Sequence, residues 1–177
     1  LAAAPRWRQA ASRPQGPQPT EETAGEPIAN LDEVAFDDME ENGLYTSSRA
    51  LFSRQIGARQ LGYNLVVLPP GKAQCPFHSH HAEEEMFLIL HGEGELRFGA
   101  ERYPLRPLDV IACPTGGAEV AHQIVNTGTM EMPYIAVSTQ SEVDACEYPD
   151  SGKIAVYTGA AIIGFAAEVL VQETGAD

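Results

Sequence analysis

Short apolar runs separated by Gly and Pro turns fill the middle of this chain, and they constrain its fold more than any other feature. The run Leu61–Leu68 ends at Pro69-Pro70-Gly71, and Met86–His91 ends at Gly92. The later runs are Glu95–Phe98, Arg102–Leu105, Asp109–Cys113, Val120–Asn126 and Pro133–Ser138. Each run has the length of a β-strand, and the first two runs to follow Gly92 are separated only by a turn that suits a hairpin. A succession of short strands of this kind predicts an all-β sandwich or barrel.

Composition excludes several classes of partner. The chain has 177 residues and a formal charge of −14, with only two lysines. Nucleic-acid-binding proteins gather Lys and Arg to neutralise phosphates, so neither nucleic acid nor an anionic membrane is expected as a partner. The longest apolar stretch, Ala160–Val171, is interrupted by Gly164 and Glu168, which leaves no segment suited to a transmembrane helix.

The chain divides into a tail and one domain. Residues 1–27 are rich in Ala, Pro, Gln, Arg and Gly and lack apolar periodicity, which predicts a disordered tail. Their Arg-rich, acid-poor start also resembles an organelle transit peptide, although the amphipathic pattern is missing. Residues 28–177 are expected to form the domain, in which the segment Gly159–Gln172 is ambiguous between strand and helix. The three cysteines form no C-x-x-C pair, which favours a reduced, cytoplasmic setting.

Three of the five histidines and one carboxylate form the candidate site. His78 and His80 are two residues apart, so in an extended strand their side chains point to the same face. Glu85 follows them closely, and His122 stands in the later run. Together these side chains can surround one divalent cation. The sequence therefore predicts a mononuclear metal site inside a β-barrel.

The order and spacing of these residues resemble the first motif of the cupin superfamily, which is Gly, H-x-H, three or four residues, Glu, six residues and Gly. Here Gly71 is followed by His78-Ser79-His80, and Glu85 comes four residues later. Six residues separate Glu85 from Gly92, a spacing that neither Glu83 nor Glu84 satisfies.

A second motif of the same superfamily is Gly, five residues, P-x-G, two residues, His, three residues and Asn. Pro114-Thr115-Gly116 and His122 to Asn126 match its two halves. Leu108 stands where the motif has its first Gly, and the loop before His122 is three residues longer, so that Glu119 occupies the literal His position. The H-x-x-x-N half selects His122.

The resemblance covers about residues 60–138 and implies a single-domain cupin barrel, or jelly roll. Residues 146–153 also resemble the tail of small single-domain cupins, some of which carry the label sugar-phosphate-isomerase-like. The implied cofactor is one divalent metal, Mn, Fe, Ni, Co or Zn, held by three imidazoles and one carboxylate with positions left open. The implied function is an enzyme of isomerase or oxygenase type that acts on a small oxygen-rich metabolite. The alternative is a non-enzymatic cupin that binds or senses a small molecule.

The other candidates have simpler interpretations. His81 is expected on the surface because it points away from His80, and Cys113 is expected to be a buried, inert thiol. Pocket-lining residues are sought among Tyr63, Phe77, Phe87, Gln123 and Tyr134, each of which also suits plain packing. The run Met86–Leu90 is apolar on both faces, so its outer face needs a second layer or a partner subunit. Together with the cupin resemblance, that run predicts a homodimer.

Overall fold

All regular elements that the structure describes are β-strands. The computed structural model describes residues 26–158 and 162–166. Within these ranges there is no helix that could cross a membrane. The predicted disordered tail lies almost wholly outside the described residues, as does most of the segment Gly159–Gln172, of which residues 162–166 form a strand.

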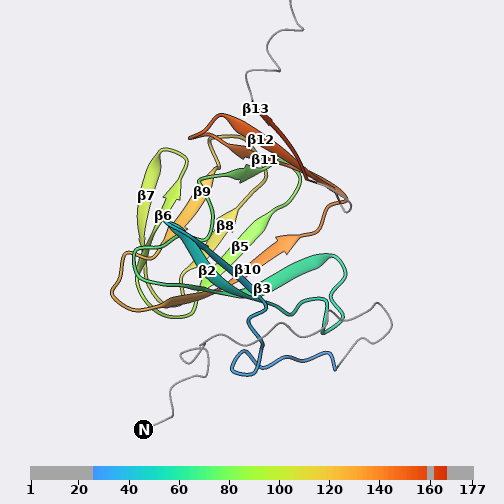
Figure 1. Ribbon diagram of the computed structural model, residues 1–177, viewed down its shortest axis with the longest axis vertical. Helices are drawn as coiled ribbons and strands as arrows, with labels where there is room; N and C mark the ends of the chain where they lie inside the picture. The colour runs from blue at the N-terminus through green and yellow to red at the C-terminus, as the bar shows by residue number, and fades with distance from the viewer. Residues whose placement is uncertain (1–25, 159–161, 167–177) are drawn as a thin grey trace, which may run out of the picture.

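Within the described residues, thirteen strands form three antiparallel sheets (Figure 1). The six-stranded sheet has the order β1-β2-β3-β10-β5-β8, the four-stranded sheet β13-β12-β11-β4, and the three-stranded sheet β7-β6-β9. The strands are β1 (Asp38–Asn42), β2 (Tyr45–Leu51), β3 (Leu61–Leu68), β4 (Ser79–His80), β5 (Glu85–Ile89), β6 (Gly94–Phe98), β7 (Glu101–Leu105), β8 (Val110–Cys113), β9 (His122–Val125), β10 (Met132–Thr139), β11 (Val143–Tyr148), β12 (Lys153–Thr158) and β13 (Ile162–Ala166).

The all-β expectation is confirmed, with one qualification about closure. The predicted hairpin is present, because β6 and β7 pair with Phe98 opposite Glu101 and Gly99 at a positive φ in the turn. The sheets stack as in a jelly roll, with β6, β7 and β9 beside the six-stranded sheet in Figure 1. Among the described strands, hydrogen bonding does not run continuously around the body, so the sheets do not close into a complete barrel.

The main core lies between the six-stranded and the three-stranded sheets. Alternate residues of each strand point into it, as the strand period of two requires. On β5 these are Phe87 and Ile89, which face Tyr134 of β10 across the core side of the sheet. Leu96 and Ile124 contribute from the opposite layer. Glu85 shares the parity of Phe87, so this packing turns its carboxylate inward.

A second cluster covers the outer face of the same sheet. Leu65, Ala50 and Phe52 are buried there beneath apolar residues of the segment 29–36. This cover lies over β2, β3 and β10. The outward side of β5 and the edge strand β8 are less protected, and Val110 is 66% exposed. Strand β5 therefore has two apolar faces, of which only the inner one is fully buried within the described chain.

The Asn of the second motif has a structural role. Asn126 is buried, and its Nδ2 donates hydrogen bonds to Leu68 O and Met130 O, each at 2.8 Å. Its Oδ1 accepts one from Gly128 N at 2.9 Å. A buried amide that makes these bonds ties β9 to the end of β3 and to the loop before β10. The side chain thus fixes the strand that carries His122.

Leu108 adopts the backbone conformation that the motif's Gly would supply. Its φ is +73°, and it is the one non-glycine residue with positive φ in the described chain. An L side chain in this region is strained by about 1–2 kcal/mol. Because the side chain is 76% exposed, little packing compensates for the strain.

We therefore expect Leu108→Gly to stabilise the protein by about 0.5–1 kcal/mol, after the extra backbone entropy of Gly in the unfolded chain is counted. Thermal and urea unfolding measure the change. Leu108→Ala is the control, because it removes the exposed side chain but keeps the β-carbon and should give no gain. A stabilisation by Ala equal to that by Gly would show that exposure, rather than φ, is what costs free energy here.

Candidate metal centre

The backbone places His78 beside His122. The two residues pair as an isolated antiparallel bridge, with His78 N donating to His122 O at 3.1 Å and His122 N donating to His78 O at 2.7 Å. Their rings lie with centroids 4.7 Å apart. This reciprocal pairing brings together two segments that are distant in the sequence. The longer loop before His122 therefore does not carry that residue away from the first motif.

Three imidazole nitrogens converge on one carboxylate oxygen. Glu85 Oε2 lies 2.9 Å from His122 Nε2, 3.5 Å from His80 Nε2 and 3.8 Å from His78 Nε2. The structure thus brings together all four residues that the sequence singled out. His78 and His122 are buried, while His80 and Glu85 are partly accessible at one side.

The other ring nitrogens are held from behind. His78 Nδ1 lies 2.8 Å from Pro76 O, and His122 Nδ1 lies 3.4 Å from Val120 O. His80 Nδ1 lies 2.5 Å from Asp144 Oδ2. A backbone carbonyl or a carboxylate that accepts from Nδ1 allows Nε2 to give its lone pair to a metal. In the metal-free protein His122 Nε2 instead donates a hydrogen bond to Glu85 Oε2, and a bound metal would displace that proton. The donor set and its supports therefore fit a divalent cation.

Asp144 is the residue of the site that the sequence reasoning missed. It lies on β11, is 4% exposed, and also accepts a hydrogen bond from Ala82 N at 2.8 Å through Oδ1. One carboxylate therefore holds both His80 and the loop between β4 and β5. Asp144 and Cys146 are two residues apart, so in a strand their side chains point to the same face, and this could have indicated that Asp144 points inward. Residues 143–148 were not predicted as a strand, however.

The carboxylates of the site remain ionised. Burial raises the pKa of Glu85, but the hydrogen bond with His122 and the neighbouring imidazoles outweigh burial and leave that pKa below its usual value. Burial also raises the pKa of Asp144, and the hydrogen bonds from His80 and from the amides of Ala82 and Glu83 again outweigh it. Both groups thus carry negative charge at neutral pH, as a cation site requires.

Cysteines lie close to the candidate metal centre, but Glu85 is the better metal ligand. Cys146 pairs with His80 across β11 and β4, and together with His78 these residues form a second possible ligand group. Burial raises the pKa of Cys146 to about 12, and that of Cys75 to about 12 as well. Both are neutral thiols in the metal-free protein, whereas Glu85 is a carboxylate. Cys113 is buried, as expected.

The residues left outside the site agree with the simpler interpretations. His81 is exposed, and its Nε2 lies 3.3 Å from Glu147 Oε2. Glu119, at the literal motif spacing, is an exposed loop residue that accepts a hydrogen bond from Gly117 N at 3.1 Å. The H-x-x-x-N criterion therefore selected the residue that lies beside His78.

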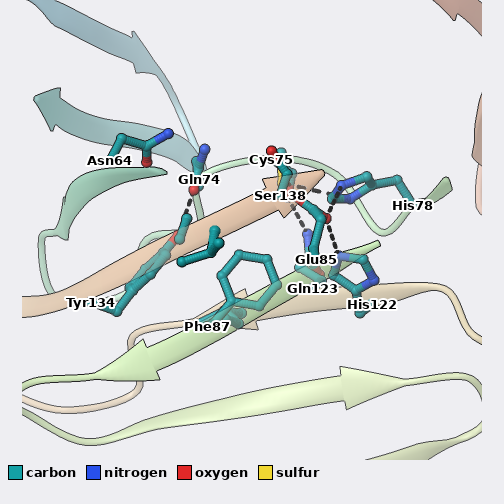
Figure 2. Close-up of a pocket in the computed structure, with 13 residues that line it drawn as sticks. Asn64, Gln74, Cys75, His78, Glu85, Phe87, His122, Gln123, Tyr134 and Ser138 are labelled. Carbon is teal, nitrogen blue, oxygen red and sulfur yellow. Dashed lines mark hydrogen bonds and ion pairs between the residues drawn. The ribbon is translucent and has the colours of Figure 1, made fainter. Parts of the chain in front are cut away.

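A small pocket opens next to the site (Figure 2). Its volume is about 90 Å³, and His78, Glu85 and His122 form one end of it. The remaining lining residues are Asn64, Gln74, Cys75, Phe87, Gln123, Ile124, Tyr134, Ala136, Val137 and Ser138. Three of the five candidates named from the sequence, Phe87, Gln123 and Tyr134, are among them. Tyr63 packs on Phe52 instead, and Phe77 lies under the Arg97 guanidinium.

The fold and the site define a small all-β protein with a His- and carboxylate-lined centre inside a jelly roll. The sequence model of the cupin domain matches residues 64–138. The predicted resemblance to the cupin superfamily is therefore confirmed for residues 64–138, which form a cupin domain.

The chain resembles three characterised or solved proteins in particular. It is 37% identical over 70 residues to the oxalate-binding protein of Thermotoga maritima, an alignment that covers 40% of this chain and 54% of that protein. A sugar phosphate isomerase of the cupin superfamily from Silicibacter pomeroyi superposes with a TM-score of 0.73 at 22% identity, over 80% of this chain and 94% of that one. A proposed sugar phosphate isomerase from Acidithiobacillus ferrooxidans gives a TM-score of 0.67 at 26% identity, over 72% and 80%.

Proposed function

We propose that this chain is a metal-dependent cupin enzyme that acts on a small, oxygen-rich metabolite. His78, His80, Glu85 and His122 would hold one divalent metal, Mn, Fe, Co, Ni or Zn. The proposal depends on one observation above all, that three Nε2 atoms approach a single oxygen of Glu85 while each Nδ1 is held from behind. Such an arrangement is organised before any metal arrives.

The metal would supply Lewis acidity toward a substrate oxygen, or a site for O2 if it is redox-active. The protein's own residues do the rest. Phe87, Ile124 and Ala136 line the pocket with apolar surface and limit water. Glu85 is the ionised carboxylate in the pocket lining and, by leaving the metal, is our candidate to take a proton from a substrate carbon and return it. An isomerase needs a group of this kind.

A non-enzymatic binding protein is the second candidate, and the oxalate-binding relative favours it. Oxalate carries paired oxygens, which is also what a metal with open positions accepts. Apart from Glu85, the pocket offers no ionised carboxylate among the residues that line it. Binding without turnover would therefore need no change in this site.

An exchange experiment separates these functions. Metal content is first measured by elemental analysis on protein purified without added metal. The loaded protein is then incubated in D2O with hydroxy-ketones and keto acids, and loss of the proton next to the carbonyl is followed by NMR. Exchange that disappears in Glu85→Gln while its metal content stays at the wild-type value supports an isomerase. Oxygen uptake without exchange supports the oxygenase type, and ligand-induced thermal stabilisation with neither supports the binding protein.

We propose that the protein works in the cytoplasm. All three cysteines are free thiols, which suits the reducing cytoplasm that we propose. The acidic charge of the chain gives no reason to add nucleic acid or a membrane as a partner.

We also propose a homodimer through the outward side of β5 and β8. Met86 and Leu88 of β5 are only half-buried there, and Val110 beside Leu88 is exposed. We expect light scattering to give twice the monomer mass at micromolar concentration. Val110→Asp should shift the mass toward the monomer, whereas the same change at exposed Val143 on β11 should not. A wild-type monomer would exclude the dimer.

A further inference from the structure

The two ends of the pocket differ in chemical character. Figure 2 shows His78, Glu85 and His122 at one end, with Asn64, Gln74 and Tyr134 at the other and Phe87 between them. A ligand whose oxygens lie at the candidate metal centre would therefore extend its remaining atoms toward the amides and the phenol. The small volume, about 90 Å³, admits a short metabolite rather than a drug-sized molecule.

The end of the pocket opposite the candidate metal centre, called the far end here, offers a ligand uncharged groups. Tyr134 Oη donates a hydrogen bond to Gln74 Oε1 at 2.5 Å, which leaves the phenol oxygen as an acceptor. Burial raises the pKa of Tyr134 well above its usual value, so it stays neutral. Asn64 Oδ1 is buried and accepts no hydrogen bond within the protein. A buried amide oxygen of this kind favours a ligand that brings a donor, such as a hydroxyl, to it.

No Lys or Arg side chain is among the residues that line this pocket, and Arg97 and Arg102 pair with carboxylates elsewhere. Arg97 makes two hydrogen bonds to Asp150 and stacks over Phe77. Arg102 pairs with Glu95. Among the described residues, those that line the pocket include no Lys or Arg.

Arg49 is the cation that acts on the far end from outside the lining. Its charge favours the ionised forms of Cys75 and Tyr134, while the charge of Glu40 opposes it at Cys75. Arg49 itself is not among the residues that line the pocket. A phosphate dianion placed there would lose its water without gaining the several charge-assisted hydrogen bonds that it needs.

We propose that the ligand is an unphosphorylated hydroxy acid or hydroxy-ketone of about three or four carbons, whose terminal hydroxyl binds at Asn64. This inference rests on the proposed function, because the other end of the ligand is held at the metal. It separates this chain from the sugar phosphate isomerases that it resembles in fold, since the pocket lining offers no Lys or Arg to a phosphate ester.

Three ligands that differ only at the far end test the inference. Glycerate has the terminal hydroxyl, lactate lacks it, and 3-phosphoglycerate carries a phosphate on it. Calorimetric titration of the metal-loaded protein should give glycerate an affinity about 3- to 10-fold higher than lactate, the effect of one hydrogen bond. The affinity of 3-phosphoglycerate should be at least about 10-fold below that of glycerate.

Variants test whether Asn64 causes the preference for glycerate over lactate. Asn64→Leu, similar in size, should lower glycerate to the affinity of lactate while metal content stays at the wild-type value. Asn42→Leu, at an exposed position of β1, should leave all three affinities unchanged. Equal affinities of glycerate and lactate, or tighter binding of 3-phosphoglycerate, would overturn the inference but not the metal site. Absence of metal, or of binding by all three ligands, would overturn the proposed function together with the inference.

Discussion

Replacing His122 by Ala should reduce bound metal from about one ion per chain to roughly a tenth or less, measured by elemental analysis after purification without chelator. The change removes one of three nitrogens that approach Glu85 Oε2, and it is the nitrogen nearest to that oxygen, at 2.9 Å. The remaining donors would hold the cation in a more open and more exchangeable set. His80→Ala should give the same loss from the opposite side of the centre.

His81→Ala is the matched control for both variants. It removes an imidazole adjacent in sequence whose ring contacts Glu147 at the surface rather than the centre. Its metal content should equal that of the wild type. Because His122 is buried, thermal unfolding of the metal-free variants must accompany the analysis, so that loss of fold is not mistaken for loss of a ligand. Full occupancy in both folded variants would refute the ligand assignment.

The proposed ligand set could be selected from sequence because each of its two motifs is local. His78 and His80 share a face through strand parity, and Glu85 was selected by its distance to Gly92. The same parity puts Phe87 and Ile89 on the face of Glu85, and both lie in the core. Strand β3 was predicted with its observed ends, and the β6–β7 hairpin was predicted from its turn.

What the sequence did not show depends on long-range pairing. Strand β4 has two residues and exists because it pairs with β11, far along the chain. Strand β11 mixes charged and apolar residues, and its alternation identifies an inward face only once the neighbouring strand is known. Asp144 was missed for this reason. Its hydrogen bond to His80 joins residues 64 positions apart, and no spacing rule describes such a contact.

The motif departures had unequal consequences. The longer loop before His122 is absorbed at the surface, where Glu119 lies, and the His78–His122 bridge restores the site. Leu108, in contrast, keeps the backbone conformation of the Gly that it replaces and is strained by it. A motif position can thus be filled by another residue when the surrounding hydrogen bonds, here Leu108 N to Ile89 O at 2.7 Å, fix the turn.

Asp144→Asn should weaken metal binding by about 10- to 100-fold although Asp144 is outside the proposed ligand set. The carboxylate accepts from His80 Nδ1 and so increases the electron-donating strength of Nε2, and it fixes the ring by the same bond. An amide keeps the shape but loses the charge and can present an N–H to Nδ1, which favours the wrong tautomer. Asp144→Ala should in addition lower the free energy of unfolding by about 1–3 kcal/mol, because Ala82 N loses its buried acceptor.

Competition titration with a metal-binding dye measures this effect, and the absorption spectrum of the Co²⁺ form reports the ligand field independently of affinity. Asp150→Asn is the control, since Asp150 pairs with Arg97 at the surface and its side chain is 57% exposed. It should leave both the dye titration and the spectrum unchanged. If Asp144→Asn bound metal within about two-fold of the wild type with an unaltered Co²⁺ spectrum, Asp144 would be a tether for the loop before β5 and no part of the metal centre. A weakened affinity with a shifted spectrum, in a variant that unfolds at the wild-type temperature without metal, would instead place its charge in direct support of His80.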